Sequence, residues 1–229
     1  MHDFLIGHIA PILWVMTAVY ALLLAALIKL RKGDKRRGVL PLLMALVVFG
    51  LLYDVFVQAL GTLMSAGGLL SALSRLRYVF HGMLIPLCFP ICTMALRMKP
   101  KALKAVWIVT LILILAGAAS GFAVKMEPVQ TGALLRYASA DDTPAWANGL
   151  QLALSIVPVL FLVAAGLIAW IREKNPHLFF AGLLMFAFAA LGPATGHADL
   201  SFVINMFGEL FMALFFWLFA GKRAKTDRR

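Results

Sequence analysis

The stretch at residues 149–171, GLQLALSIVPVLFLVAAGLIAWI, contains no charged side chain over 23 consecutive positions. A helix that crosses the hydrocarbon core of a bilayer needs about 20 mainly apolar residues, because each residue adds only about 1.5 Å of length. This stretch therefore predicts a helix that spans a membrane.

The rest of the chain has the same character. Hydrophobic residues make up 63% of the 229 positions and charged residues 14%, whereas a soluble domain is about half apolar and a quarter charged. We predict an all-α integral membrane protein, with residues 1–229 forming one seven-helix transmembrane domain. The predicted spans are 4–30, 39–63, 76–96, 105–124, 149–171, 178–194 and 200–221.

The 21 basic residues, which give a net charge of +11, predict the orientation. They occur in short clusters between apolar runs and not along one solvated face, so we do not expect nucleic acid as a partner. Lysine and arginine collect in cytoplasmic loops. With the amino terminus outside, all but four fall inside, and residues 222–229 form a basic cytoplasmic tail. The four exceptions are Arg75, Arg77, Lys125 and Arg136. We expect a multi-pass protein of a bacterial inner (plasma) membrane.

Polar residues within the spans are the strongest functional signal. A charged side chain at the centre of a bilayer costs roughly 3 kcal/mol, so an ionisable residue there marks a candidate site. Three pairs have i, i+4 spacing, which places both members on one helix face. The pairs are Asp54 with Gln58, Arg77 with His81, and Asn205 with Glu209. We predict that these six residues form a ligand-binding site in the outer half of the bundle.

The third span carries the residues that need explanation, in the sequence RLRYVFHGMLIPLCFP at 75–90. Arg77 is near the predicted end of its helix, so its long side chain is expected to reach the interface. His81 is too short for this and needs a polar partner, for which Asp54 and Glu209 are the candidates. Pro86 and Pro90 remove helical hydrogen bonds, which predicts a bend just below His81.

The fourth and fifth spans contain no ionisable residue, so we expect the function to reside in helices one, two, three and seven. Helix one would add His8. Gly117 and Gly121 have the GxxxG spacing that allows close contact with a neighbouring helix. Cys88 and Cys92 are expected to be small core residues. The external segment 125–148 is either a lid or a plain connection.

Several functions agree with this pattern. The first hypothesis is binding or sensing of a small polar ligand, a cation or a lipid headgroup in an outward-facing pocket between helices 1, 2, 3 and 7. The alternatives are an intramembrane zinc-dependent hydrolase using His8, His81 and His197, and a proton-coupled transporter using Asp54 and Glu209. A polar network that only fixes helix register is also open.

The expected surroundings are the lipid bilayer, and no cofactor or bound metal is predicted. The seventh span has no lysine, which excludes a retinal Schiff base there. Whether the protein is an enzyme, and its oligomeric state, do not follow from the sequence.

Overall fold

The computed structural model describes residues 2–32 and 38–226. The predicted basic segments 29–37 and 222–229 extend beyond these ranges, so positions 33–37 and 227–229 lie outside the described residues.

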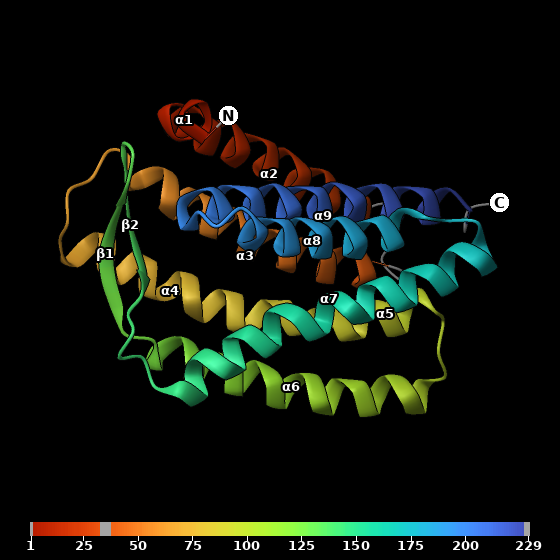
Figure 1. The fold of residues 1–229 in the computed structure, drawn as a ribbon. Helices are drawn as coiled ribbons and strands as arrows, with labels where there is room; N and C mark the ends of the chain where they lie inside the picture. The colour runs from red at the N-terminus through yellow and green to blue at the C-terminus, as the bar shows by residue number, and fades with distance from the viewer. Residues whose placement is uncertain (1, 33–37, 227–229) are drawn as a thin grey trace.

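Seven helices in the described ranges are long and apolar enough to cross a membrane, which confirms the predicted number of spans and identifies a multi-pass membrane protein. They lie along one another with a β-hairpin at one end (Figure 1). The spans are α2 (Ile9–Lys32), α3 (Val39–Leu60), the third made of α4 (Gly68–Leu84), a 3-10 turn η1 (Ile85–Leu87) and α5 (Cys88–Ala95), α6 (Pro100–Ala123), α7 (Ala145–Glu173), α8 (His177–Ala194) and α9 (Ala198–Thr226).

The first predicted helix is divided in two. A short α1 (His2–Gly7) precedes α2, and the break falls at His8. Pro11 explains the break, because it has no N–H to donate to the carbonyl of Gly7 and its ring crowds that carbonyl.

The third span begins earlier than predicted, at Gly68 instead of residue 76. His81 therefore lies 13 residues into α4, about 20 Å along the helix axis from its first residue. The predicted disturbance below His81 is present as the 3-10 turn that contains Pro86.

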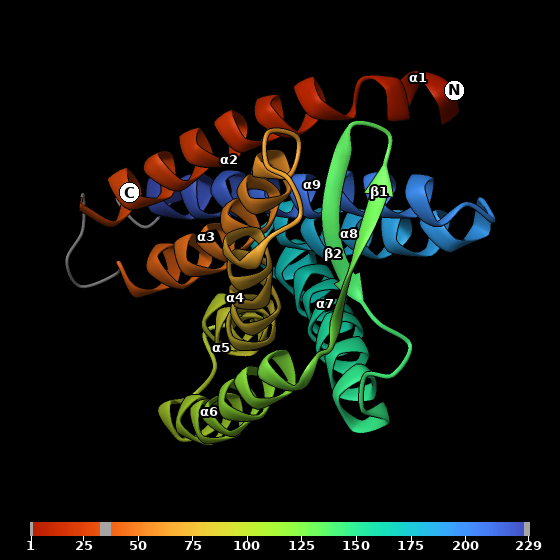
Figure 2. The same cartoon turned by 90° about the vertical axis from the view of Figure 1, so that its left-hand side faces the viewer.

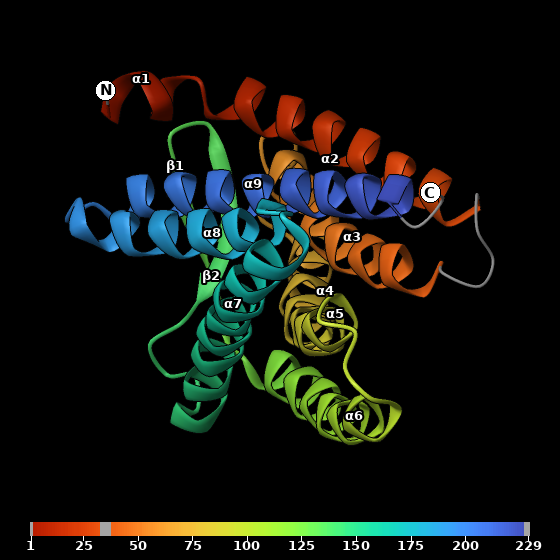
Figure 3. The ribbon, with the colours of Figure 1, turned by 90° about the vertical axis from the view of Figure 1, so that its right-hand side faces the viewer.

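Glycines allow two close helix contacts that shape the interior. A Cβ atom on Gly117 of α6 would lie 2.0 Å from the carbonyl oxygen of Gly82 on α4, so the two backbones touch. This contact is the close packing that the GxxxG spacing predicts. A Cβ on Gly166 of α7 would similarly lie 2.3 Å from the backbone nitrogen of Phe179 on α8. From this contact α7 diverges from α8 toward the hairpin end (Figures 1 and 3).

The segment between α6 and α7 forms a β-hairpin that the sequence analysis did not predict. Strand β1 (Met126–Thr131) pairs antiparallel with β2 (Leu134–Ser139). The two-residue turn begins with Gly132 at φ +57°, a conformation that glycine adopts without strain. The backbone N–H of Leu135 donates to the carbonyl of Gly61 at 3.0 Å, which fixes the hairpin to the end of α3. Figure 2 shows the hairpin crossing the end of the bundle.

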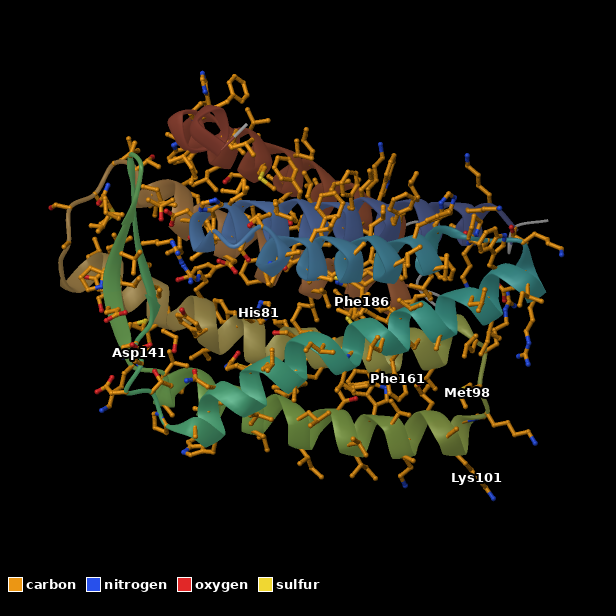
Figure 4. The ribbon with its side chains drawn as sticks, viewed as in Figure 1. His81, Met98, Lys101, Asp141, Phe161 and Phe186 are labelled. Atoms are coloured by element: carbon orange, nitrogen blue, oxygen red, sulfur yellow. The ribbon has the colours of Figure 1, made fainter. Side chains whose placement is uncertain are left out.

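The basic clusters lie at the opposite end, called here the basic end. Met98 and Lys101 mark this end in Figure 4, and Asp141 marks the hairpin end. The Arg223 guanidinium donates to the carbonyls of Ala95 and Met94, which joins the end of α9 to the end of α5. The two ends of the bundle therefore differ: one carries the basic clusters and the other carries the hairpin.

Candidate functional site

The six residues predicted as a site line one cavity of about 350 Å³, called here the polar cavity. They come from the consecutive helices α3 and α4 and from α9, which is far from both in the chain. The complete lining is Asp54, Gln58, Arg77, Tyr78, His81, Gln151, Leu152, Ser155, Phe202, Asn205, Met206 and Glu209.

An ion pair between α3 and α4 forms one wall of the polar cavity. The Nε atom of Arg77 lies 3.0 Å from Oδ1 of Asp54, and the Gln58 amide donates to the same oxygen at 3.2 Å. Arg77 also donates from Nη2 to the carbonyl of Tyr137 in the hairpin at 3.3 Å. The prediction that Arg77 reaches the interface is wrong, because these partners hold it in the interior with only 9% of its surface exposed.

The second feature is a cluster of three potential ligand groups, called here the acid–histidine cluster: Asp54, His81 and Glu209. Each offers an oxygen or nitrogen atom, and these atoms all lie within 4.8 Å of one another. Asn205 donates from its amide to Oε1 of Glu209 at 3.3 Å, and Glu209 is 4% exposed. His81 is therefore close to both carboxylates that the sequence suggested as its partners.

The fifth span contributes polar groups that the sequence analysis missed. Nε2 of His81 lies 3.4 Å from the Ser155 hydroxyl on α7, which itself donates to the carbonyl of Gln151 at 2.9 Å. The Gln151 amide donates to the Ser120 hydroxyl on α6 at 2.9 Å. Gln151 and Ser155 have the same i, i+4 spacing as the three recognised pairs. Counting uncharged polar pairs as well as ionisable ones would have found them.

Two predicted contributors lie elsewhere. His8 is exposed at the junction of α1 and α2, where its Nδ1 lies 2.8 Å from the carbonyl of Phe4. His197 is exposed in the turn between α8 and α9. In the first span, the fully buried polar side chain is that of Tyr20 and not that of His8.

The hairpin ties α4 to the start of α9. The Thr131 hydroxyl donates to Oδ1 of Asp199 at 2.7 Å, and the Arg136 guanidinium lies 4.6 Å from the ring centre of Phe202. Burial lowers the pKa of Arg136 from its usual value, and the nearby charge of Arg77 lowers it further. Because Phe202 lines the polar cavity, the hairpin covers the same end of the bundle as this cavity.

A second cavity of about 430 Å³, called here the apolar cavity, adjoins the first. The two share His81, Leu152, Ser155, Asn205 and Glu209. Its other lining residues are Leu51, Ile85, Ile156, Val159, Met185, Phe186, Ala189, Ala190, Pro193 and Met212. Figure 4 shows His81 between α4 and the α8–α9 pair, with Phe186 farther along α8.

The apolar cavity reaches the surface of the bundle between α7 and α8. Leu152 and Ile156 on α7 are 61% and 42% exposed, and Phe186 on α8 is 43% exposed, yet all three line the cavity. These residues belong to spanning helices, so the surface they share faces lipid. The opening lies on the hairpin side of the Gly166 contact, where α7 and α8 diverge.

Fold and geometry define a class: a multi-pass membrane protein of seven spanning helices, with buried ionisable groups beside an internal apolar cavity. Comparison with models of protein families and with curated proteins finds no match for this chain. The chemistry of the two cavities is therefore the basis for inferring a function.

Proposed function

We propose that this protein binds a small amphipathic molecule, with the polar head in the polar cavity and the apolar chain in the apolar cavity. The observation that carries the proposal is that the two cavities share five lining residues, so that one ligand can occupy both. Their volumes, about 350 and 430 Å³, lie within the range of ordinary small-molecule sites.

The division of chemistry within the pocket supports an amphiphile. His81, Asn205 and Glu209 offer hydrogen-bonding groups at the boundary between the cavities, and Phe186 and Met185 offer apolar surface beyond it. A wholly polar ligand would leave the apolar surface unused. A hydrocarbon would leave the buried polar groups without compensation, which is costly in a dry interior.

The opening between α7 and α8 indicates the route of entry. An amphiphile dissolved in the bilayer would place its chain against Ile156 and Phe186 without first crossing water. This narrows the first sequence hypothesis, a small polar ligand, cation or lipid headgroup, toward a lipid-like molecule.

The test uses single-chain amphiphiles of one length and different heads: dodecylamine, dodecanol and dodecanoate. The protein is reconstituted in nanodiscs, and its thermal unfolding is followed as each probe is added. A ligand that binds only the folded state raises the apparent stability. We expect at least one probe to raise the melting temperature in a saturable manner.

Two matched pairs of variants separate this pocket from nonspecific partition into lipid. Ala189→Phe fills the apolar cavity, whereas Ala153→Phe adds the same ring to an exposed face of α7 that lines neither cavity. Glu209→Gln changes the head site, whereas Glu127→Gln changes an exposed hairpin residue. The proposal is supported if the rise in melting temperature is lost in Ala189→Phe and Glu209→Gln but kept in Ala153→Phe and Glu127→Gln. Equal shifts in all four variants would refute it.

The transporter alternative keeps one supporting observation, because its two carboxylates, Asp54 and Glu209, lie within one cluster. Flux driven by a proton gradient in liposomes, lost in Glu209→Gln, would favour transport over binding. The three-histidine hydrolase has less support. Among the described residues, the structure groups His81 with Asp54 and Glu209 and not with the other two histidines.

We propose the orientation with the amino terminus and the hairpin outside and the basic end in the cytoplasm of a bacterium, bounded by its inner membrane. The concentration of lysine and arginine at the basic end supports it. A membrane-impermeant maleimide should label Gln130→Cys but not Lys101→Cys in intact cells, since both positions are exposed on opposite ends. The reverse labelling would overturn the orientation.

A further inference from the structure

We propose that the acid–histidine cluster of Asp54, His81 and Glu209 is a binding site for a divalent transition-metal ion of the zinc class. Two carboxylates and one imidazole are donors that zinc accepts, in a set that leaves a coordination position open. The sequence analysis placed these three residues in a ligand-binding site, but it assigned zinc only to another set of ligands, His8, His81 and His197. The inference does not depend on amphiphile binding.

The distances between the donor atoms are compatible with a metal site whose side chains move toward the bound ion. The three donor atoms lie within 4.8 Å of one another. Tetrahedral zinc with bonds of 2.0–2.2 Å places its donors about 3.4 Å apart. Movements of about 1.4 Å or less, within reach of side-chain rotation, would complete the shell.

The surrounding hydrogen bonds have the pattern of a metal site. Each potential ligand is anchored through one atom: Asp54 by Arg77 and Gln58, Glu209 by Asn205, and His81 by Ser155. Each residue has one more atom that could face an ion: the second carboxylate oxygen of Asp54 and of Glu209, and the second ring nitrogen of His81. Metal ligands are typically held by such outer partners, which orient the donor atom that remains.

An independent observation comes from two polar atoms outside the three ligands. Among the described residues, Oε1 of Gln58 and the hydroxyl of Tyr20 are buried without a hydrogen-bond partner, and their residues are 4% and 0% exposed. Gln58 lines the same cavity as the cluster. Buried polar atoms are almost always satisfied, so the Gln58 oxygen supports a further group in this cavity, such as an ion with its water.

Charge balance is compatible with a bound ion. With both carboxylates ionised and His81 neutral, the two acids and the Arg77 guanidinium carry a net charge of −1. A divalent ion that carries one anionic ligand, a hydroxide or a carboxylate, would neutralise it. In the metal-free protein, protonation of one carboxyl group would have the same effect.

The test is metal binding by the 229-residue chain in detergent. After removal of metal with a chelator, the protein is titrated with Co²⁺ while visible absorption is recorded, and Zn²⁺ is then added as competitor. We expect one Co²⁺ per chain, displaced by Zn²⁺. His81→Ala and Glu209→Gln should each weaken binding at least tenfold, as loss of a direct ligand requires.

His8→Ala and His197→Ala are the matched controls, because both histidines are exposed and outside the cluster. They should bind Co²⁺ as the wild type does. Helical circular dichroism and elution volume identify variants that fail to fold, and Glu209→Gln, which keeps its shape, provides a second test if His81→Ala is misfolded. Absence of stoichiometric binding in the wild type, or equal losses in the controls, would overturn the metal site. If Co²⁺ fails to bind while amphiphiles still stabilise the protein, only the metal inference has failed.

Discussion

Two ion pairs of this protein have the same chemistry and opposite surroundings. The pair between Asp54 and Arg77 lies inside the bundle, with side chains 18% and 10% exposed. The pair between Arg97 and Glu173 lies at the basic end, with side chains 55% and 27% exposed, at a similar distance of 2.9 Å. Distance alone therefore does not distinguish them.

The two pairs differ in what surrounds and solvates each charge. At the basic end, water and salt can solvate either partner, so the pair contributes little to stability. Inside the bundle, each charge depends on the other and on the hairpin, and an apolar pair would have been a simpler solution for stability. The interior pair is thus better explained by a role in the polar cavity.

The largest expected effect comes from breaking the interior pair. Arg77→Met should lower the free energy of unfolding by about 3–5 kcal/mol, because it leaves a buried carboxylate without its partner. Reversible unfolding in mixed micelles measures the change. The double variant Asp54→Asn with Arg77→Met should recover part of the loss. A loss below about 1 kcal/mol in Arg77→Met would contradict the account of this pair.

The close contact between α4 and α6, next to the polar cavity, gives the second effect. Gly117→Ala should cost about 1–3 kcal/mol, because the new methyl group meets the backbone of Gly82. Gly149→Ala is the control, since nothing lies within 4 Å of the added Cβ. It should be neutral or stabilising, as alanine favours a helix. Equal costs for both would mean that the two helices do not touch as described.

A smaller effect is expected from the amide that supports Glu209. Asn205→Ala removes this i, i+4 hydrogen bond within α9 and should cost about 0.5–1.5 kcal/mol, the usual net contribution of one hydrogen bond. Asn148→Ala removes an exposed amide that accepts from Ser139, and should change stability less. A larger loss of unfolding free energy in Asn148→Ala than in Asn205→Ala would mean that the Asn205 amide does not stabilise Glu209 as described.

The smallest effect should come from the pair at the basic end. Glu173→Gln is expected to cost between about 0 and 1 kcal/mol, and the cost should decrease in high salt. Measuring Glu173→Gln and Arg77→Met at two ionic strengths sharpens the comparison, because the interior pair should respond little to salt. A large, salt-independent cost for Glu173→Gln would contradict it.

The sequence predicted the parts that depend on local pattern. Seven apolar runs gave seven helices, and i, i+4 spacing gave six residues that line one cavity. It misplaced Arg77, because the first turns of α4 contain Gly68, Ser71 and Ser74, a composition that does not predict a spanning helix. Only packing against other segments shows that this polar portion is helical and partly buried.

The remaining features depend on contacts between distant segments. The hairpin is held by Gly61 and Asp199, neither of which is near it in sequence. Ser155 becomes part of the site only because α7 brings it to His81. The apolar cavity arises from the divergence of α7 and α8, which no single helix encodes.

The most direct test of the central claim, that the two cavities form one amphiphile site, is an experimental structure of the protein in nanodiscs with a 12-carbon alcohol brominated along its chain. The account predicts bromine density beside Phe186 and Met185, with the alcohol oxygen within hydrogen-bond distance of Glu209 or His81. Bromine density confined to the lipid-facing surface of α6, with none between α7 and α8, would contradict it.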